Sequence, residues 1–247
     1  MSLPKYLAEA NQLIAGLPAE LRTLFVGRCE LVSLQHDEIL TKAGTAAEYA
    51  FFPIDSFVAA ICPVDDTAVQ IGLIGHEGMV IGSLVIDVKV SVLTSLVQGA
   101  GRAYRIHCRN LQGLIRDNPK LRESLQIYAA SSVDQLAKNM ACAGVHTAGQ
   151  RLARWLLVAR DAAHSDELAL THKTLAFMLG IRRERVTTVA SLFQKQGLIS
   201  CRRGEVTILD EAGLLAKSCN CYEAQTGMAG GQIPLVDPSV FTYKKMG

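Results

Sequence analysis

The spacing of apolar residues changes twice along the chain. Residues 1–28 carry apolar positions at helical spacing, and residues 30–106 contain short β-type runs separated by glycine or acidic turns. Helical spacing returns over residues 111–143. The β-type runs are residues 30–34, 38–42, 50–54, 57–64, 68–74, 79–86, 91–98 and 102–106. Because many short, evenly spaced strands are typical of barrels and jelly rolls, we predict an α+β fold that begins with an antiparallel β-roll flanked by helices.

A second pattern, over residues 168–209, predicts two short helices joined by a tight turn. Thr171 is a good N-cap, and Leu175, Met178 and Leu179 then recur at helical spacing. Gly180 follows where a helix end favours a residue that tolerates positive φ. A helix-turn-helix of this kind places its second helix in the major groove of DNA.

The second helix has one apolar face and one free face. Its apolar positions are Val186, Val189, Ala190 and Phe193, and its free positions are Glu184, Thr188, Ser191 and Lys195. Arg182, Arg183 and Arg185 surround Glu184 in the first turn, where the helix dipole disfavours cations unless an anion is near. This conflict indicates phosphate or guanine as the missing partner, and Arg183 and Glu184 suit base readout.

Two short β-type runs, residues 198–201 and 205–209, follow the second helix and predict a hairpin. Arg202, Arg203 and Gly204 form its turn, which makes a wing with two cations at the tip. Each of these pieces is common alone, since charged runs are usually solvated faces. Together they favour a winged-helix DNA-binding domain, because a capped helix is followed in order by a glycine turn, a basic helix start and a basic hairpin.

The segments THKTLAFMLGIRRERVTTVASLFQKQGLISCRRGEVTIL (171–209) and QRLARWLLVARD (150–161) resemble the C-terminal domain of the Crp/Fnr family of bacterial transcription regulators. The resemblance implies that Arg183, Glu184 and Thr188 read bases. Several family members carry arginine at the last of these positions, so threonine there implies a different operator preference.

Residues 39–58 and 75–86 resemble, more weakly, the family's effector domain of the cyclic-nucleotide-binding type. The resemblance places the effector pocket at Gly82, Ser83 and Ser91. The two serines stand where nucleotide-binding members carry a glutamate and an arginine, and a buried cyclic phosphate without a cation is poorly stabilised. We therefore expect no tight binding of cyclic AMP.

Other cofactors have little support in the sequence. Only Cys29 lies in the first forty residues, which disfavours the iron–sulfur cluster of oxygen-sensing relatives, and isolated histidines do not specify haem. Cys219 and Cys221 could join a metal or redox site, but no second pair lies near them in the sequence. We expect no cofactor and no metal.

Composition and charge support a globular DNA-binding protein. The 247 residues are 49% apolar and 19% charged, and the seven cysteines, without a CxxC pair, disfavour a disulfide framework. No apolar run approaches a membrane span and the N-terminus has no hydrophobic signal region, so we expect a cytoplasmic protein. Residues 146–222 contain 11 lysines and arginines against 7 acidic residues, whereas residues 1–145 contain 12 against 14. The basic excess lies with the predicted recognition helix.

The expected organisation has four parts. They are an effector-sensing roll (1–110), a long dimerisation helix and hinge (111–145), a winged helix (146–222) and a poorly ordered tail (223–247). Spacing alone allows the long helix to pack on its own roll or on a second copy, with small residues at 129–132, and the resemblance implies the dimer. Expected partners are duplex DNA, a second copy, RNA polymerase, and a small-molecule effector or none. The alternatives are a constitutive DNA-binding protein with a structural roll and an enzyme built on the roll.

Overall fold

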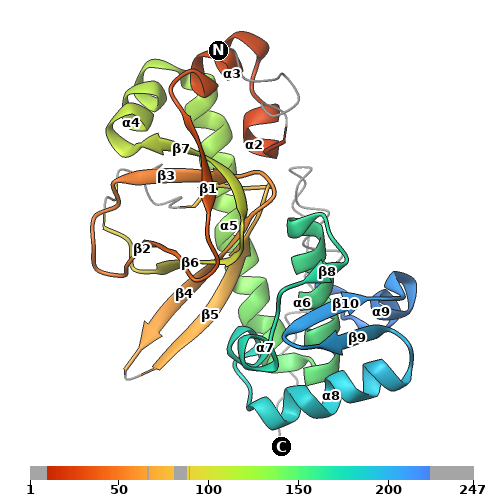
Figure 1. Cartoon of the computed structure of the whole chain (residues 1–247). Coiled ribbons are helices and arrows are strands. Elements are labelled where there is room, and N and C mark those ends of the chain that lie inside the picture. The colour runs from red at the N-terminus through yellow and green to blue at the C-terminus, as the bar shows by residue number, and fades with distance from the viewer. Residues whose placement is uncertain (1–9, 66, 81–87, 89, 223–247) are drawn as a thin grey trace, which may run out of the picture.

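Two antiparallel sheets pack around one core in the first half of the chain (Figure 1). The computed structural model describes residues 10–65, 67–80, 88 and 90–222. One sheet has the strand order β1-β7-β3 and the other β2-β6-β4-β5. The strands are β1 (Glu30–Leu34), β2 (Ile39–Thr41), β3 (Tyr49–Pro53), β4 (Phe57–Val64), β5 (Thr67–Ile74), β6 (Thr94–Gly99) and β7 (Gly101–His107). Phe52 and Tyr104, which pair across β3 and β7, are fully buried between the sheets.

Short helices close the N-terminal side of the roll. They are α2 (Gln12–Ala15), α3 (Ala19–Val26) and, after the last strand, α4 (Cys108–Asp117). Asn11 caps α2 by accepting a hydrogen bond from the Ile14 amide, and its buried side-chain amide donates to the carbonyls of Pro53 and Gly78 at 2.9 Å. Phe25 of α3 packs edge-on against Phe52 with ring centroids 5.1 Å apart. The helices are thereby joined to the roll core.

The long helix α5 (Pro119–Val145) has two different faces. Leu121 and Leu125 are buried against the roll, and the Tyr128 hydroxyl donates to the Met79 carbonyl at 3.1 Å. The opposite face carries large apolar side chains that no described residue covers: Ile127, Val133, Met140 and Val145 are 57%, 65%, 78% and 79% exposed. One face of α5 therefore belongs to the roll, while the other is open.

The second half of the chain forms a separate core around α6 (Ala148–Ala163), in which Trp155 and the fully buried Leu156 lie. Thr147 and Gln150 make a reciprocal capping box at its start. A small sheet of order β8-β10-β9 completes this half. The remaining elements are β8 (Glu167–Leu168), α7 (His172–Leu179), α8 (Arg183–Lys195), β9 (Ile199–Arg202), β10 (Glu205–Ile208) and α9 (Glu211–Lys217).

The two halves touch at two places beyond α5. The tip of β5 lies beside α7, and Phe57 and Leu73 of the roll pack into the core around α6. Gly75 approaches α6 so closely that a Cβ atom on it would lie 2.8 Å from that of Ala162. The ring of the next residue, His76, packs at a tilt of 47° against the ring of His164 at the end of α6, with ring centroids 4.3 Å apart. Any movement of the second half must break these contacts.

The predicted α+β architecture is confirmed, and every predicted strand whose residues are described is present within two or three residues of its expected bounds. The run 79–86 lies mostly outside the described residues, as does the expected tail at 223–247. Met140 of α5 is 78% exposed, although the adjacent Asn139 side chain donates to the Ile71 carbonyl of β5 at 2.8 Å. Among the described helices, none has the length and apolar character that crossing a bilayer requires.

Candidate nucleic-acid interface

The turn between α7 and α8 fixes the direction in which the second helix points. Thr171 caps α7 by accepting the Thr174 amide at 3.0 Å, and Gly180 ends it with φ of 60°. The Arg151 guanidinium of α6 donates to the Leu179 carbonyl and so ties the end of α7 to α6. The expected cap and the expected glycine turn are both confirmed. Arg182, in extended backbone conformation, then starts α8.

The back of α8 is part of the core. Val186 and Ala190 are fully buried, and Val189 and Phe193 are 8% and 6% exposed. These four residues belong to the same hydrophobic cluster as Leu152 and Leu156 of α6. Because the apolar face is fixed, the other face of α8 is held toward solvent.

The first turn of α8 presents three exposed arginines, Arg182, Arg183 and Arg185, and the exposed Glu184. In the described part of the chain, none of the three guanidinium groups has an ion pair or a side-chain hydrogen bond. Arg160, by contrast, contacts Asp161, Asp166 and Glu211 at 3.6, 2.6 and 2.7 Å. The hydrogen bond with Asp166 raises the pKa of the Arg160 guanidinium.

The arginines of this half are therefore of two kinds. Arg160 joins α6 to neighbouring segments, whereas those of α8 stand at the positive end of a helix dipole with no carboxylate partner, among the described residues, beyond the chain neighbour Glu184. A concentration of unpaired cations is electrostatically unfavourable in the isolated domain. An anion with closely spaced charges, such as the backbone of a nucleic acid, would relieve it.

The wing lies beside α8 and adds two cations. Arg203 and Gly204 at the hairpin tip have φ of 46° and 87°, the backbone of a two-residue turn that follows the strand twist. Arg202 and Arg203 are both exposed. The Gln194 side chain accepts the Cys201 amide at 2.8 Å and thereby joins α8 to β9. The short strand β8, which was not predicted, extends the wing sheet.

The other predicted contact residues have simpler surroundings. Lys195 is exposed at the end of α8, and Thr188 is exposed with its hydroxyl donating to the Glu184 carbonyl at 3.0 Å. Sequence reasoning missed His172 and Thr187, whose Nδ1 and Oγ1 atoms are 3.1 Å apart and join the first turn of α7 to α8. The available signal in the sequence was His172, a polar residue directly after the N-cap Thr171. The N-terminus of a helix contacts phosphate in many DNA-binding proteins.

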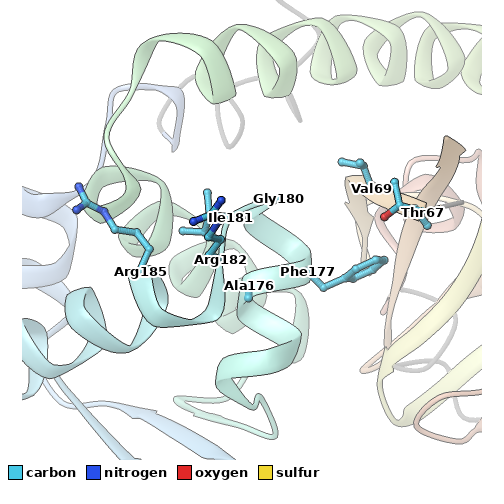
Figure 2. Close-up of a pocket in the computed structure, with 9 residues that line it drawn as sticks. Thr67, Val69, Ala176, Phe177, Gly180, Ile181, Arg182 and Arg185 are labelled. Atoms are coloured by element: carbon cyan, nitrogen blue, oxygen red, sulfur yellow. The ribbon is translucent and has the colours of Figure 1, made fainter. Parts of the chain in front are cut away.

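A groove of about 640 Å³ separates the tip of β5 from the start of α8. Figure 2 shows Phe177 of α7 pointing toward Thr67 and Val69 of β5, with Arg182 and Arg185 on the other side of Gly180. The roll therefore reaches the helix-turn-helix within a few residues of the exposed arginines. A conformational change in the β4–β5 hairpin would alter the surroundings of the first residues of α8.

Of the predicted effector pocket, only Ser91 is described, because Gly82 and Ser83 lie outside the described residues. Ser91 is buried, and its hydroxyl donates to the Leu93 carbonyl at 2.8 Å and accepts the Leu93 amide at 3.1 Å. The hydroxyl proton and one of its two acceptor positions are thus used by the local backbone.

Comparison with known proteins agrees with this geometry. Residues 150–217 match the Crp-like helix-turn-helix domain family. A protein described as a regulator of the Crp/Fnr family from Eubacterium rectale shares 17% identity and a TM-score of 0.64, over 87% of this chain and 99% of its own. FixK2 from Bradyrhizobium japonicum shares 16% identity and a TM-score of 0.64, over 77% and 98%. A CRP-family transcriptional regulator from Thermus thermophilus shares 18% identity and a TM-score of 0.63, over 76% and 96%. A search of curated proteins gives no match.

The matched domain and the geometry of α7 and α8 show that residues 150–217 form a Crp-like helix-turn-helix domain. The whole chain, a β-roll followed by a long helix and a winged helix, shares its fold with solved structures that are described as Crp/Fnr or CRP-family regulators. The matched domain confirms the resemblance seen in residues 150–161 and 171–209.

Proposed function

We propose that the chain binds a two-fold symmetric operator as a homodimer and that a signal in the β-roll controls this binding. The observation that carries the proposal is the first turn of α8, where three arginines without a carboxylate partner among the described residues project from a helix whose back is buried. Arg183, Glu184 and Thr188 would face base edges in the major groove. Arg182, Arg185, Lys195, Arg202 and Arg203 would hold the phosphates on either side.

The open face of α5 supports the homodimer. Val133 and Met140 are seven residues apart and therefore lie on one side of α5, where they are 65% and 78% exposed. Exposed apolar residues at heptad spacing on a long helix are typical of a helix that packs against a second copy. The small residues at 129–132 lie only partly on this face: Ala130 is exposed, whereas Ala129 packs on the roll. Two copies joined along α5 would present two α8 helices to DNA.

Within this proposal each of three parts of the chain has its own role. Residues 1–110 sense the signal, residues 111–145 join the two copies, and residues 146–222 read DNA. The contacts of Gly75 and His76 with α6, and of β5 with α7, would carry the signal between the first and third parts. RNA polymerase and a small-molecule effector remain expected partners.

A constitutive DNA-binding protein is the second candidate, and it is favoured by the Ser91 hydroxyl, whose proton is already donated to the Leu93 carbonyl. Limited proteolysis of the hinge at residues 144–149, with and without cell extract, separates the two. A controlled protein changes its cleavage rate when its effector is present. A constitutive protein is cleaved at the same rate in both samples.

Selection from random duplexes tests the proposed function. We expect enrichment of a sequence with two inverted half-sites whose centres lie one helical turn apart, about 34–36 Å. Footprinting of the selected duplex should show protection of both half-sites. Enrichment of a single half-site without symmetry would contradict the homodimer, and failure to enrich any sequence would contradict specific DNA binding.

The contact between His76 and His164 predicts that acid weakens the docking of the two halves. Burial and the nearby His164 lower the pKa of His76, and the negative charge of Asp161 only partly opposes them. Its Nε2 atom lies 3.1 Å from the side-chain nitrogen of Gln12, and the adjacent Glu77 carboxylate accepts the Gly75 amide. The docked state therefore favours neutral His76. The stability of the docked state falls as the pH drops from the unperturbed histidine pKa of about 6.5 toward the lowered pKa of His76.

Hydrogen exchange of residues 144–149 measures this effect. Between about pH 8 and about pH 5.5, protection of the hinge should decrease in the wild type, after correction for the intrinsic pH dependence of exchange. His76→Gln, which keeps a polar side chain of similar length, should show a flatter profile. Equal profiles for the two proteins would mean that His76 does not couple docking to pH.

A further inference from the structure

Four side chains with metal-binding atoms meet where α5 ends and where the chain passes beyond α9. They are Cys142, His146, Cys219 and Cys221, and their ligand atoms all lie within 4.8 Å of one another. The Sγ atoms of Cys142 and Cys219 are 3.6 Å apart, and the Sγ atom of Cys221 is 3.7 Å from Nδ1 of His146. The two halves of the cluster are separated by more than seventy residues in the sequence.

Local structure holds each pair of ligands in place. Cys142 and His146 are four residues apart in the last turn of α5, so their side chains lie on the same side of the helix. The His146 amide donates to the Cys142 carbonyl at 3.1 Å. On the other side, the Tyr222 amide donates to the Cys219 carbonyl at 3.1 Å, and the Tyr222 hydroxyl donates to Asp161 of α6 at 2.7 Å. The segment that carries Cys219 and Cys221 is thereby attached to α6.

We propose that these four residues form a zinc site with three thiolate ligands and one imidazole ligand. Structural zinc is tetrahedral, with bonds of about 2.3 Å to sulfur and about 2.0–2.1 Å to nitrogen. A tetrahedron with these bonds has edges of about 3.8 Å between two sulfurs and about 3.5 Å between sulfur and nitrogen. The distances of 3.6 Å between Cys142 and Cys219 and 3.7 Å between Cys221 and His146 are close to these edges, and all four ligand atoms lie within 4.8 Å of one another.

Burial and charge at the cluster also suit a bound dication. Cys142 and Cys219 are 2% and 4% exposed, whereas His146 and Cys221 are partly exposed and leave a path for the ion. The guanidinium of the buried Arg154 lies near enough to the Cys142 thiol to interact with it electrostatically. Zinc with three thiolates carries a net negative charge, which this neighbouring cation would balance. The C-terminal end of α5 favours a cation as well.

A disulfide or an iron–sulfur cluster would explain the positions of these four residues less completely than a single metal ion. A disulfide joins two sulfurs at about 2.05 Å and would leave a third sulfur and an imidazole beside it without a role. An iron–sulfur cluster distributes its thiolates over separate iron atoms, which requires a wider arrangement than one in which all four ligand atoms converge. A single tetrahedral ion uses all four ligands at once.

The zinc would join three parts of the chain: the end of α5, the hinge that starts at His146, and the segment after α9. It would fix the position of the winged helix relative to the long helix. The sequence could not indicate this, because Cys219 and Cys221 have no ligand pair near them in the sequence and the second pair is supplied only by the fold. The site does not depend on DNA binding, so either proposal can fail alone.

Metal analysis of the full chain tests the site. Protein purified under reducing conditions, incubated with zinc and dialysed should retain one zinc ion per chain. Cobalt, which unlike zinc is coloured, should give the visible bands of a tetrahedral thiolate complex in the same protein. His146→Ala and Cys221→Ala change the two partly exposed ligands and should lower zinc retention by about tenfold or more. Zinc should also raise the Tm of the wild type but not of these variants.

Cys201→Ser is the matched control, because Cys201 lies in the same half of the chain, is partly exposed and is not part of the cluster. It should retain zinc and the cobalt spectrum. Circular dichroism of all variants establishes that they are folded. The proposal is overturned if the wild type retains no zinc, if the ligand variants retain as much as the wild type, if iron is bound in place of zinc, or if mass spectrometry finds a Cys142–Cys219 disulfide in freshly purified protein.

Discussion

Replacing Phe193 with alanine is expected to lower the free energy of unfolding of the C-terminal half by about 3–5 kcal/mol. Phe193 lies on the buried face of α8 and packs into the cluster that contains Leu156 of α6. Removing the ring leaves a cavity between α8 and α6, because neither helix can move inward without losing its other contacts. Urea unfolding followed by tryptophan fluorescence measures the effect, since Trp155 lies in the same core.

Leu192, the preceding residue on the same helix, is 51% exposed and provides the control. Leu192→Ala should change the free energy of unfolding by no more than about 0.5 kcal/mol. The contrast between adjacent positions tests whether α8 is oriented as described. Similar losses for both variants would mean that the helix presents a different face to the core, and that the arginines of its first turn do not project outward.

Replacing Arg183 with alanine should weaken binding to the selected operator by about 1–3 kcal/mol and relax the sequence preference at one base pair in each half-site. Arg183 is exposed in the first turn of α8, where its guanidinium can reach guanine O6 and N7. Fluorescence anisotropy with the operator and with duplexes altered at each position measures both effects at fixed salt concentration.

Arg116→Ala is the matched control for this experiment. Arg116 is an exposed arginine of α4, far from the helix-turn-helix, and lies 3.9 Å from its neighbour Asp117. Its loss should leave operator affinity and preference unchanged. If Arg183→Ala weakened binding equally on all duplexes, Arg183 would be a phosphate contact and base readout would be assigned to the wrong residue.

Local signals in the sequence predict most of the helices and strands. Strand β4 begins and ends where its apolar run predicts. Thr171 caps α7 with its hydroxyl, and Gly180 ends the helix because a residue without a Cβ atom tolerates positive φ. Such features depend on residues within one turn or one strand, so spacing and capping rules identify them. The same rules identified the arginines of α8, because a cation at a helix start conflicts with the dipole.

Features that depend on distant segments could not be predicted in this way. The polar Asn139 of α5 faces β5, where it donates to the Ile71 carbonyl, while its apolar neighbour Met140 is 78% exposed. The approach of Gly75 to Ala162 and the packing of His76 against His164 arise only when the two halves dock. The convergence of Cys142 and His146 with the cysteines after α9 has the same origin, since the fold brings together two pairs that are far apart in the sequence.

The most direct test of DNA binding is retardation of genomic fragments in a gel at low ionic strength. Folded wild-type protein, dimeric by sedimentation, should retard a subset of fragments from its own genome, and added salt should weaken the complexes steeply as released counterions predict. A folded, dimeric preparation that retards no fragment under these conditions would contradict the account.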